Sequence, residues 1–284
     1  MAITNLIISG RNWIKESGAA NPTGGSWRLP ITNILDPRPK VVAESVDTNT
    51  SSTQFSVDLG ANKPIDLIWF ANLRTSRSAS VNLVLSTHAD FSSPVYSGTV
   101  SAWPQDTTAG GADNWGITTS DGVYDPKTYD AIGRPRFFPI TNVSARYVLV
   151  GIDDHGSATP VQIGCFGVSE VINQSFAFNW QLTFLDESIK TIVPNGSTYF
   201  DLRSRKRRLS IGLPPTDESY IYTRIFDWLS WMGQSTPFVI IPFGEQTYVK
   251  RYEKTGIYGC LSSAPAFTNP FTSYYNLGLQ VDQL

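Results

Sequence analysis

The spacing of hydrophobic positions predicts β-strands along most of the chain. Residues 55–60 (FSVDLG) alternate between apolar and polar side chains, and residues 65–72 (IDLIWFAN) are almost continuously apolar. Alternation is typical of a strand with one buried face, and a short apolar run is typical of a strand buried on both faces. Residues 81–85, 147–152 and 161–171 predict further strands. Because short strands are separated by turn-rich segments, we expect a β-sandwich and not a parallel α/β sheet.

One long segment, about residues 101–139, carries no strand signal. Among its Gly, Asp and Pro residues stand the aromatic residues Trp103, Trp115, Tyr124 and Tyr129. Loops of this length in compact domains are usually functional or disordered, and aromatic side chains argue against disorder. We therefore take these four rings as candidate contacts for a ligand or partner, with local packing of the rings as the open alternative.

The pattern changes from residue 176. Residues 176–184 alternate with a heavily aromatic face, made of Phe176, Phe178, Trp180, Leu182 and Phe184. A turn at residues 193–197 (VPNGS) leads into a second strand at residues 198–213, so a long hairpin is expected. Strands are also predicted at residues 238–241, 248–262 and 275–281.

A single helix is predicted at residues 216–232. Thr216 is a good N-cap, and Asp217 and Glu218 suit the first turn. Gly233 stands where a helix often ends. The apolar residues at helical spacing are Ile221, Ile225, Trp228, Leu229 and Met232. The sequence thus predicts an all-β fold of two domains: a β-sandwich at residues 1–171, and a β-barrel or sandwich with one helix at residues 172–284.

Five segments of the first domain occur in the order found in galactose-binding-like (discoidin) jelly-roll domains. They are NILD (33–36), FSVDLG (55–60), IDLIW (65–69), ARYVLV (145–150) and residues 163–171. The first domain therefore resembles this family, which implies a jelly-roll sandwich. Members bind sugars or lipid heads through loops at one end, and many are structural spacers. The family has no short binding signature, so the resemblance assigns no binding residue here.

The order of elements in residues 172–284 resembles the tail-tube type of domain in phage tail tube and distal-tail proteins. In that family a β-sandwich carries one flanking helix and a long hairpin, and six copies close a ring. Together the two resemblances imply a siphophage distal-tail or baseplate component. Its location would be the virion tail, after assembly in the bacterial cytoplasm, and its partners would be other tail proteins of the tube and hub.

Composition agrees with a protein that forms interfaces. Only 16% of residues are charged, whereas 12% are aromatic. Large buried interfaces favour aromatic over charged residues, although strands favour aromatics as well. The net charge of −2 predicts no general attraction to nucleic acid or membrane. No apolar run of 18 residues predicts a membrane span, and no signal peptide is visible. Cys165 and Cys260 lie far apart, which favours free thiols over a disulfide framework.

Candidates for catalysis are few. The sequence has two histidines. His155 follows Asp153 and Asp154, and this segment is better explained as a polar turn than as a metal-binding or catalytic site. Carboxylates for glycan cleavage would have to come from the loop residues Asp113, Asp121, Asp125 and Asp130. No Gly-rich loop for phosphate precedes a helix. We therefore expect a protein without enzymatic activity, cofactor or metal.

The sharpest charged feature is a basic run: Arg203, Arg205, Lys206, Arg207 and Arg208. In an extended strand, successive residues of this run would point to opposite sides. We expect the run at an assembly interface with an acidic neighbour; contact with DNA passing through a lumen and a solvated hairpin are the alternatives.

The main expectation is thus a structural ring protein of a phage tail tip, a hexamer that displays its first domain. The alternative is a carbohydrate-binding or receptor-binding protein that uses the aromatic loop to hold a cell-surface glycan. The oligomeric state distinguishes the two functions: a ring supports the structural protein, and a monomer supports the carbohydrate-binding protein.

Overall fold

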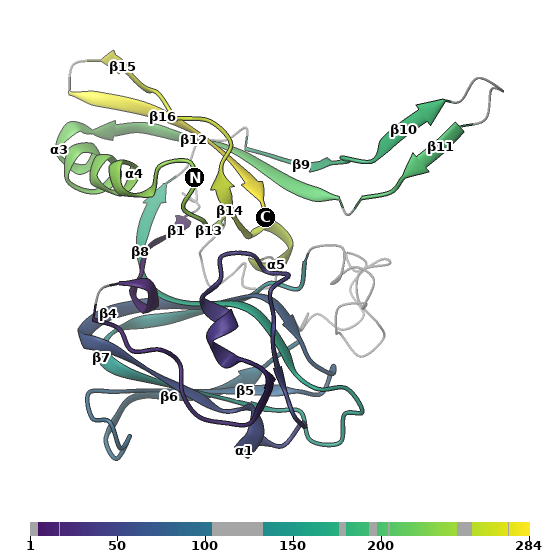
Figure 1. Ribbon diagram of the computed structural model, residues 1–284. Coiled ribbons are helices and arrows are strands. Elements are labelled where there is room, and N and C mark those ends of the chain that lie inside the picture. Colours follow the sequence, from purple (N-terminus) through teal and green to yellow (C-terminus); the bar gives the residue numbers. More distant parts are fainter. Residues whose placement is uncertain are drawn as a thin grey trace, which may run out of the picture.

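The computed structural model describes residues 5–16, 18–103, 133–175, 180–192, 198–203, 205–242, 252–271 and 273–284. Most of these residues form strands, and 14 of the strands belong to one antiparallel sheet that runs through both halves of the chain. Figure 1 shows two bodies, one above the other, with a long hairpin projecting from the upper body. The prediction of a mostly β fold is confirmed.

The described residues among the first 175 form eight strands and three short helices. The strands are β1 (Asn5–Asn12), β2 (Trp27–Leu29), β3 (Ala43–Ser45), β4 (Phe55–Arg74), β5 (Ser80–Ser86), β6 (Pro94–Ser101), β7 (Arg136–Asp153) and β8 (Gln162–Ser175). The helices are η1 (Trp13–Lys15), η2 (Ile31–Leu35) and α1 (Thr50–Thr53).

The strands β4 and β7 each run through both layers of a β-sandwich. The start of β4 pairs with the end of β7, as at Phe55 and Val150, and the end of β4 pairs with β8. A shift in register at residues 58–63 marks the passage of β4 from one layer to the other. Phe55 and Phe166 come from opposite layers, and their ring centroids lie 5.2 Å apart. The first hydrophobic core therefore fills the space between the layers.

The remaining elements form the upper body. The strands are β9 (Gln181–Leu185), β10 (Ile189–Ile192), β11 (Thr198–Asp201), β12 (Lys206–Asp217), β13 (Phe238–Ile241), β14 (Ile257–Leu261), β15 (Phe267–Phe271) and β16 (Tyr274–Gln283). The helical segments are α3 (Glu218–Tyr220), η4 (Ile221–Phe226), α4 (Asp227–Met232) and α5 (Tyr252–Thr255).

The large sheet has the order β6-β5-β7-β4-β8-β1-β13-β14-β16-β12-β9. The helix formed by α3, η4 and α4 covers one face of its second half, where Trp228 contacts Phe238 edge to face at 5.0 Å between ring centroids. The predicted helix is confirmed at residues 218–232. Its N-cap lies one residue later than expected: Asp217 and not Thr216 caps the helix, accepting a hydrogen bond from the Ser219 amide at 2.9 Å.

A third cluster of buried side chains joins the two bodies. In β13, Phe238 and Ile240 face the core under the helix, whereas Val239 and Ile241 face the cluster that contains Trp69 of β4. The continuous apolar run of β13 is therefore explained by burial on both faces. The same alternation in β4 divides residues 67–71 between the sandwich core and this cluster.

Three segments differ from the predictions. Residues 252–255 form the helix α5 where a continuous strand was expected over 248–262. Where one strand was expected at residues 198–213, β11 ends at Asp201 and β12 begins at Lys206. The strand β1 was not predicted, and it lies between β8 and β13, so the first residues of the chain link both bodies. The proposed domain boundary at residue 171 falls inside β8.

Candidate functional site

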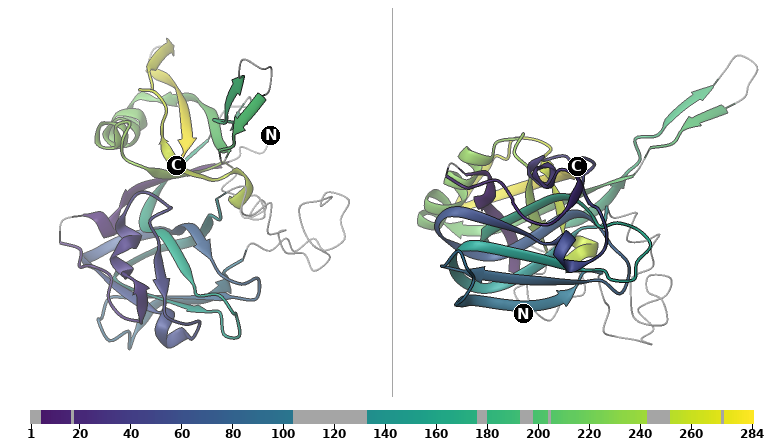
Figure 2. Two further views of the ribbon diagram at one scale, coloured as in Figure 1. Left: turned by 45° about the vertical axis from the view of Figure 1, so that its right-hand side comes forward. Right: turned by 60° about the horizontal axis from the view of Figure 1, so that its bottom comes forward.

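A hairpin made of β10 and β11, which we call the arm, projects from the upper body (Figures 1 and 2). Every residue of both strands is exposed. The pairing of Ile189 with Asp201 and of Thr191 with Tyr199 places Ile189 and Tyr199 on one face. Ile192 and Phe200 occupy the other face by the same register. Both faces of the arm thus present large apolar side chains, each at least 47% exposed.

The base of the arm carries the basic run, and most of its charges meet carboxylates of the same chain. The four surface pairs are Arg203 with Asp201 (3.5 Å), Arg205 with Asp186 (3.5 Å), Lys206 with Glu187 (3.3 Å) and Arg208 with Asp282. The expected alternation begins only at Lys206, where β12 starts. An assembly role for these five side chains stays a prediction, but four of them are already paired with carboxylates inside the chain.

Arg207, the fifth side chain of the run, is fully buried. Its Nε donates to Gln283 Oε1 at 2.9 Å, and its Nη1 donates to the carbonyl oxygens of Glu253 and Lys254 at 3.1 and 2.9 Å. Burial lowers the pKa of Arg207 to about 9. Arg207 thus anchors β12 to α5 and β16, a role that the charge pattern alone did not indicate.

The helix lies at the opposite end of the upper body from the arm (Figures 1 and 2). It carries a second exposed apolar surface, formed by Tyr222 and Phe226. Tyr222 packs against Phe226 and Tyr275 with ring centroids 5.9 and 5.7 Å apart. We call the exposed pair Tyr222 and Phe226 the aromatic patch.

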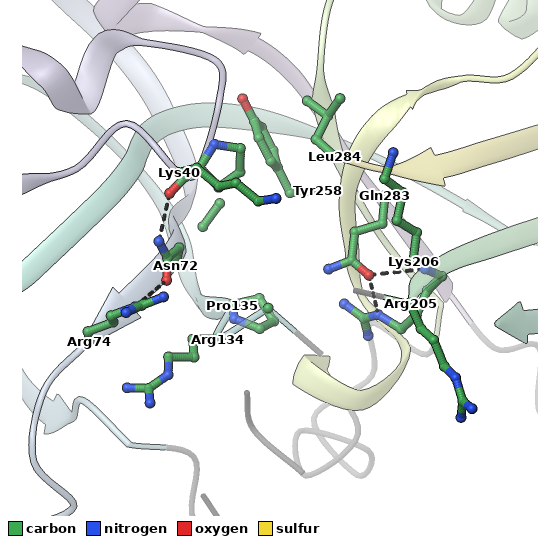
Figure 3. Close-up of a pocket in the computed structure, with 14 residues that line it drawn as sticks. Lys40, Asn72, Arg74, Arg134, Pro135, Arg205, Lys206, Tyr258, Gln283 and Leu284 are labelled. Carbon is green, nitrogen blue, oxygen red and sulfur yellow. Dashed lines mark hydrogen bonds between the residues drawn. The ribbon is translucent and has the colours of Figure 1, made fainter. Parts of the chain in front are cut away.

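A cleft of about 550 Å³ opens between the two bodies. Figure 3 shows Lys40, Asn72 and Arg74 on one side of it and Arg205, Lys206 and Gln283 on the other. Its charged side chains are all cationic: Lys40, Arg74, Arg134, Arg205, Lys206 and Arg207. Sequence reasoning missed this site, because its walls come from segments far apart in the chain.

Of the four aromatic residues singled out in the long loop, the structure describes only Trp103. Trp103 is buried, and the Arg134 guanidinium lies 5.7 Å from the centre of its ring. Trp115, Tyr124 and Tyr129 lie outside the described residues, as do Asp113, Asp121, Asp125 and Asp130. Contact of these four aromatic residues with a ligand or partner, such as a glycan, stays a prediction.

The remaining chemical candidates have structural roles where they are described. His155 lies in a turn, where its amide donates to Asp153 Oδ1 at 3.2 Å, and Asp154 accepts from the Ser76 amide at 2.9 Å. The polar-turn interpretation is therefore confirmed. Cys165 and Cys260 are free thiols, and burial raises the pKa of both. Within the described ranges, no cluster of three metal-ligating side chains occurs, and no helix is long and apolar enough to cross a membrane.

No family model and no curated protein matches this sequence. Solved structures with a similar course of the backbone align with about half of this chain. CpGH89CBM32-6 of Clostridium perfringens, a carbohydrate-binding module, is 10% identical over 56% of this chain and 99% of its own, with a TM-score of 0.36. A fucose-binding module of Streptococcus pneumoniae is 14% identical over 56% of this chain and 95% of its own, with a TM-score of 0.36.

A GH29 fucosidase of Ruminococcus gnavus in complex with fucose is 13% identical over 57% of this chain, with a TM-score of 0.38. The aligned region spans only 27% of that enzyme. None of these three is described as a viral tail protein. Scores of this size carry no conclusion about a ligand or an activity of this chain.

Proposed function

We propose that this chain is a structural subunit that assembles head to tail with further copies of itself. The arm is the observation that carries the proposal. A two-stranded hairpin with both faces in water is marginally stable at best. Large apolar side chains on both of its faces would be stabilised by a cover on each side.

The aromatic patch is the surface that suits the arm. It is apolar, it is exposed, and it lies at the far end of the same body. An arm and an acceptor at opposite ends cannot satisfy each other within one copy. They make a head-to-tail contact between copies, which closes into a ring or continues as a filament.

The setting proposed for such a ring is a phage tail tip, as the resemblance of the second half to tail-tube domains implies. Its location would be the virion tail, after assembly in the bacterial cytoplasm, with tube and hub proteins as neighbours and six copies in the ring. The carboxylates that pair with the basic run would leave its cations with a minor part in assembly.

Complementation between two variants tests the proposal. In the arm variant, Ile192, Tyr199 and Phe200 are each changed to Ser; in the patch variant, Tyr222 and Phe226 are each changed to Ser. All five side chains are exposed, so both variants should fold. We expect each variant alone to be a monomer by mass photometry. An equimolar mixture should form dimers and stop there, because only one intact arm meets one intact patch.

The matched control changes Val46 and Val95 to Ser, which are exposed apolar residues of the lower body. This variant should assemble like the unchanged chain. Normal assembly of the arm variant, or a mixture that stays monomeric while the unchanged chain forms rings, would refute the head-to-tail contact.

Glycan binding by the lower body is the second candidate. It rests on the sandwich architecture, in which the core between two layers leaves the connecting loops available at the ends. Binding to a glycan array by a monomer, undiminished in the arm variant, would favour this function over assembly.

A further inference from the structure

The cleft between the two bodies concentrates positive charge that the proposed assembly does not use. Six cationic side chains line it, and among the described residues no carboxylate side chain does. Lys40, Arg74 and Arg134 belong to the lower body, whereas Lys206 and Arg207 begin β12 of the upper body and Arg205 directly precedes it. Like charges that face each other across a cleft repel, so the arrangement favours an anion between them.

The cations of the two walls differ in how they are held. Arg205 and Lys206 already contact Asp186 and Glu187 at the base of the arm, at 3.5 and 3.3 Å. Lys40 and Arg74 are exposed, and among the described residues no carboxylate pairs with either. These two side chains are therefore available to a ligand.

The lower wall of the cleft is closely packed around Arg74. Asn72 has a left-handed backbone with φ of 65°, a conformation that Asn tolerates better than most residues. Its Nδ2 donates to the Pro39 carbonyl at 2.6 Å, and its Oδ1 accepts from Arg74 Nε at 3.1 Å (Figure 3). A Cβ atom on Gly164 would collide with the carbonyl oxygens of Pro39 and Ala71. Close packing thus holds the Asn72 side chain in place, and its hydrogen bond orients the guanidinium of Arg74.

We propose that this cleft is a binding site for the phosphate group of a small molecule. A carboxylate offers one planar edge, which a single guanidinium satisfies. A phosphate offers three strong acceptor oxygens and nearly two charges, which matches the two available cations, Lys40 and Arg74, acting together. The volume of about 550 Å³ lies in the usual range for small-molecule sites. The apolar side chains of Pro39, Ala71 and Tyr258 complete the lining and suit the carbon skeleton of a phosphate ester.

The test is isothermal titration of the full chain at constant ionic strength, with chloride as the background anion. The probes are inorganic phosphate, glycerol 3-phosphate and glucuronate. We expect saturable binding of a phosphate probe and much weaker binding of the carboxylate probe. Tighter binding of glycerol 3-phosphate than of inorganic phosphate identifies an ester as the ligand, and the reverse order identifies the free ion.

Two double variants with the same change in net charge locate the site. Lys40→Gln with Arg74→Gln removes cations of the cleft, and Lys15→Gln with Arg224→Gln removes exposed cations elsewhere. The cleft variant should lose phosphate affinity by at least about tenfold, since charge-assisted hydrogen bonds are lost. The control should bind like the unchanged chain. Circular dichroism in chloride checks that each variant is folded. If the Arg74 substitution disturbs the lower wall of the cleft, the single variant Lys40→Gln is compared with the unchanged chain instead.

Three results would overturn the proposal: equal loss of affinity in both double variants, glucuronate binding as tight as phosphate binding, or no saturable binding of either phosphate probe. None of them bears on assembly, because Lys40 and Arg74 lie in neither the arm nor the aromatic patch.

Discussion

At the scale of single residues, three charged side chains are packed at the junction of the two bodies. Arg136 of β7 forms an ion pair with Glu253 of α5, and Arg207 donates to the carbonyl oxygen of Glu253. Glu253 and Arg207 are buried and Arg136 is nearly so. Burying a charged side chain away from water costs free energy, which its ion-pair and hydrogen-bond partners must offset. The three residues therefore tie β7, α5 and β12 together.

Glu253→Ala should be strongly destabilising, because it leaves Arg136 buried without its carboxylate. We expect a loss of about 3–5 kcal/mol in the free energy of unfolding, measured by urea denaturation. Glu187→Ala is the matched control: Glu187 also pairs with a cation, Lys206, but both are largely exposed. That variant should lose less than about 1 kcal/mol. Equal losses would show that the junction pair contributes no more than a surface pair.

At the scale of elements, a bidentate ion pair joins β4 and β7 where the sandwich bends. Arg146 Nε and Nη2 donate to Asp58 Oδ1 and Oδ2 at 2.7 and 2.8 Å. These hydrogen bonds lower the pKa of Asp58 below its usual value. A carboxyl group whose pKa is lowered by folding stabilises the fold above its unfolded pKa, and this contribution is lost as the pH falls through the folded pKa.

Arg146→Met should therefore reduce stability more at pH 7 than in acid. The difference in unfolding free energy between the unchanged chain and the variant should shrink below about pH 4, where Asp58 becomes protonated in the unfolded chain. Urea titrations at pH 7 and pH 3 measure it. Arg224→Met, which removes an exposed cation without a described carboxylate partner, should show no such pH dependence. A constant difference for Arg146→Met would contradict a role of the ion pair.

Strands and helices could be predicted from the sequence where the local pattern of apolar and polar residues reflects how they are buried. The apolar run Phe238–Ile241 forms β13, and the capped apolar stripe at residues 218–232 forms the helix. The strand β1 was not recognised, because its apolar run is only three residues long, Leu6–Ile8, and Ser9 and Gly10 follow it. A hairpin was expected around residues 193–197, but local pattern does not show whether another layer covers Ile189 and Ile192.

The candidate sites were harder to predict than the elements. Arg207 has the same sequence signal as its exposed neighbours, and only the packing of α5 and β16 buries it. Lys40 and Arg74 are isolated cations in the sequence, yet they share one wall of the cleft. A basic run within one segment can be recognised from sequence, whereas a basic cleft assembled from several segments requires the fold.

At the scale of the whole molecule, the cluster between the two bodies determines whether they unfold together. Tyr258 of β14 packs on Trp69 of β4 with ring centroids 4.9 Å apart, and its hydroxyl donates to the Pro37 carbonyl at 3.1 Å. Burial raises the pKa of Tyr258, as expected for a phenol that is held out of water. The sheet also continues through this junction from β8 to β1 and β13. Packing and strand pairing therefore both couple the bodies.

We expect the full chain to unfold in one calorimetric transition, and Tyr258→Ala to lower its midpoint by removing about 3–5 kcal/mol of stability. The loss comes from a cavity against Trp69 and from the missing hydrogen bond to Pro37. Tyr199→Ala removes the same side chain from the exposed arm and should leave the midpoint of the monomer unchanged. If the unchanged chain shows two transitions and Tyr258→Ala moves only one, the bodies fold independently. A single transition that shifts as a whole would mean that the cluster around Trp69 makes the chain one cooperative unit, despite its two separate cores.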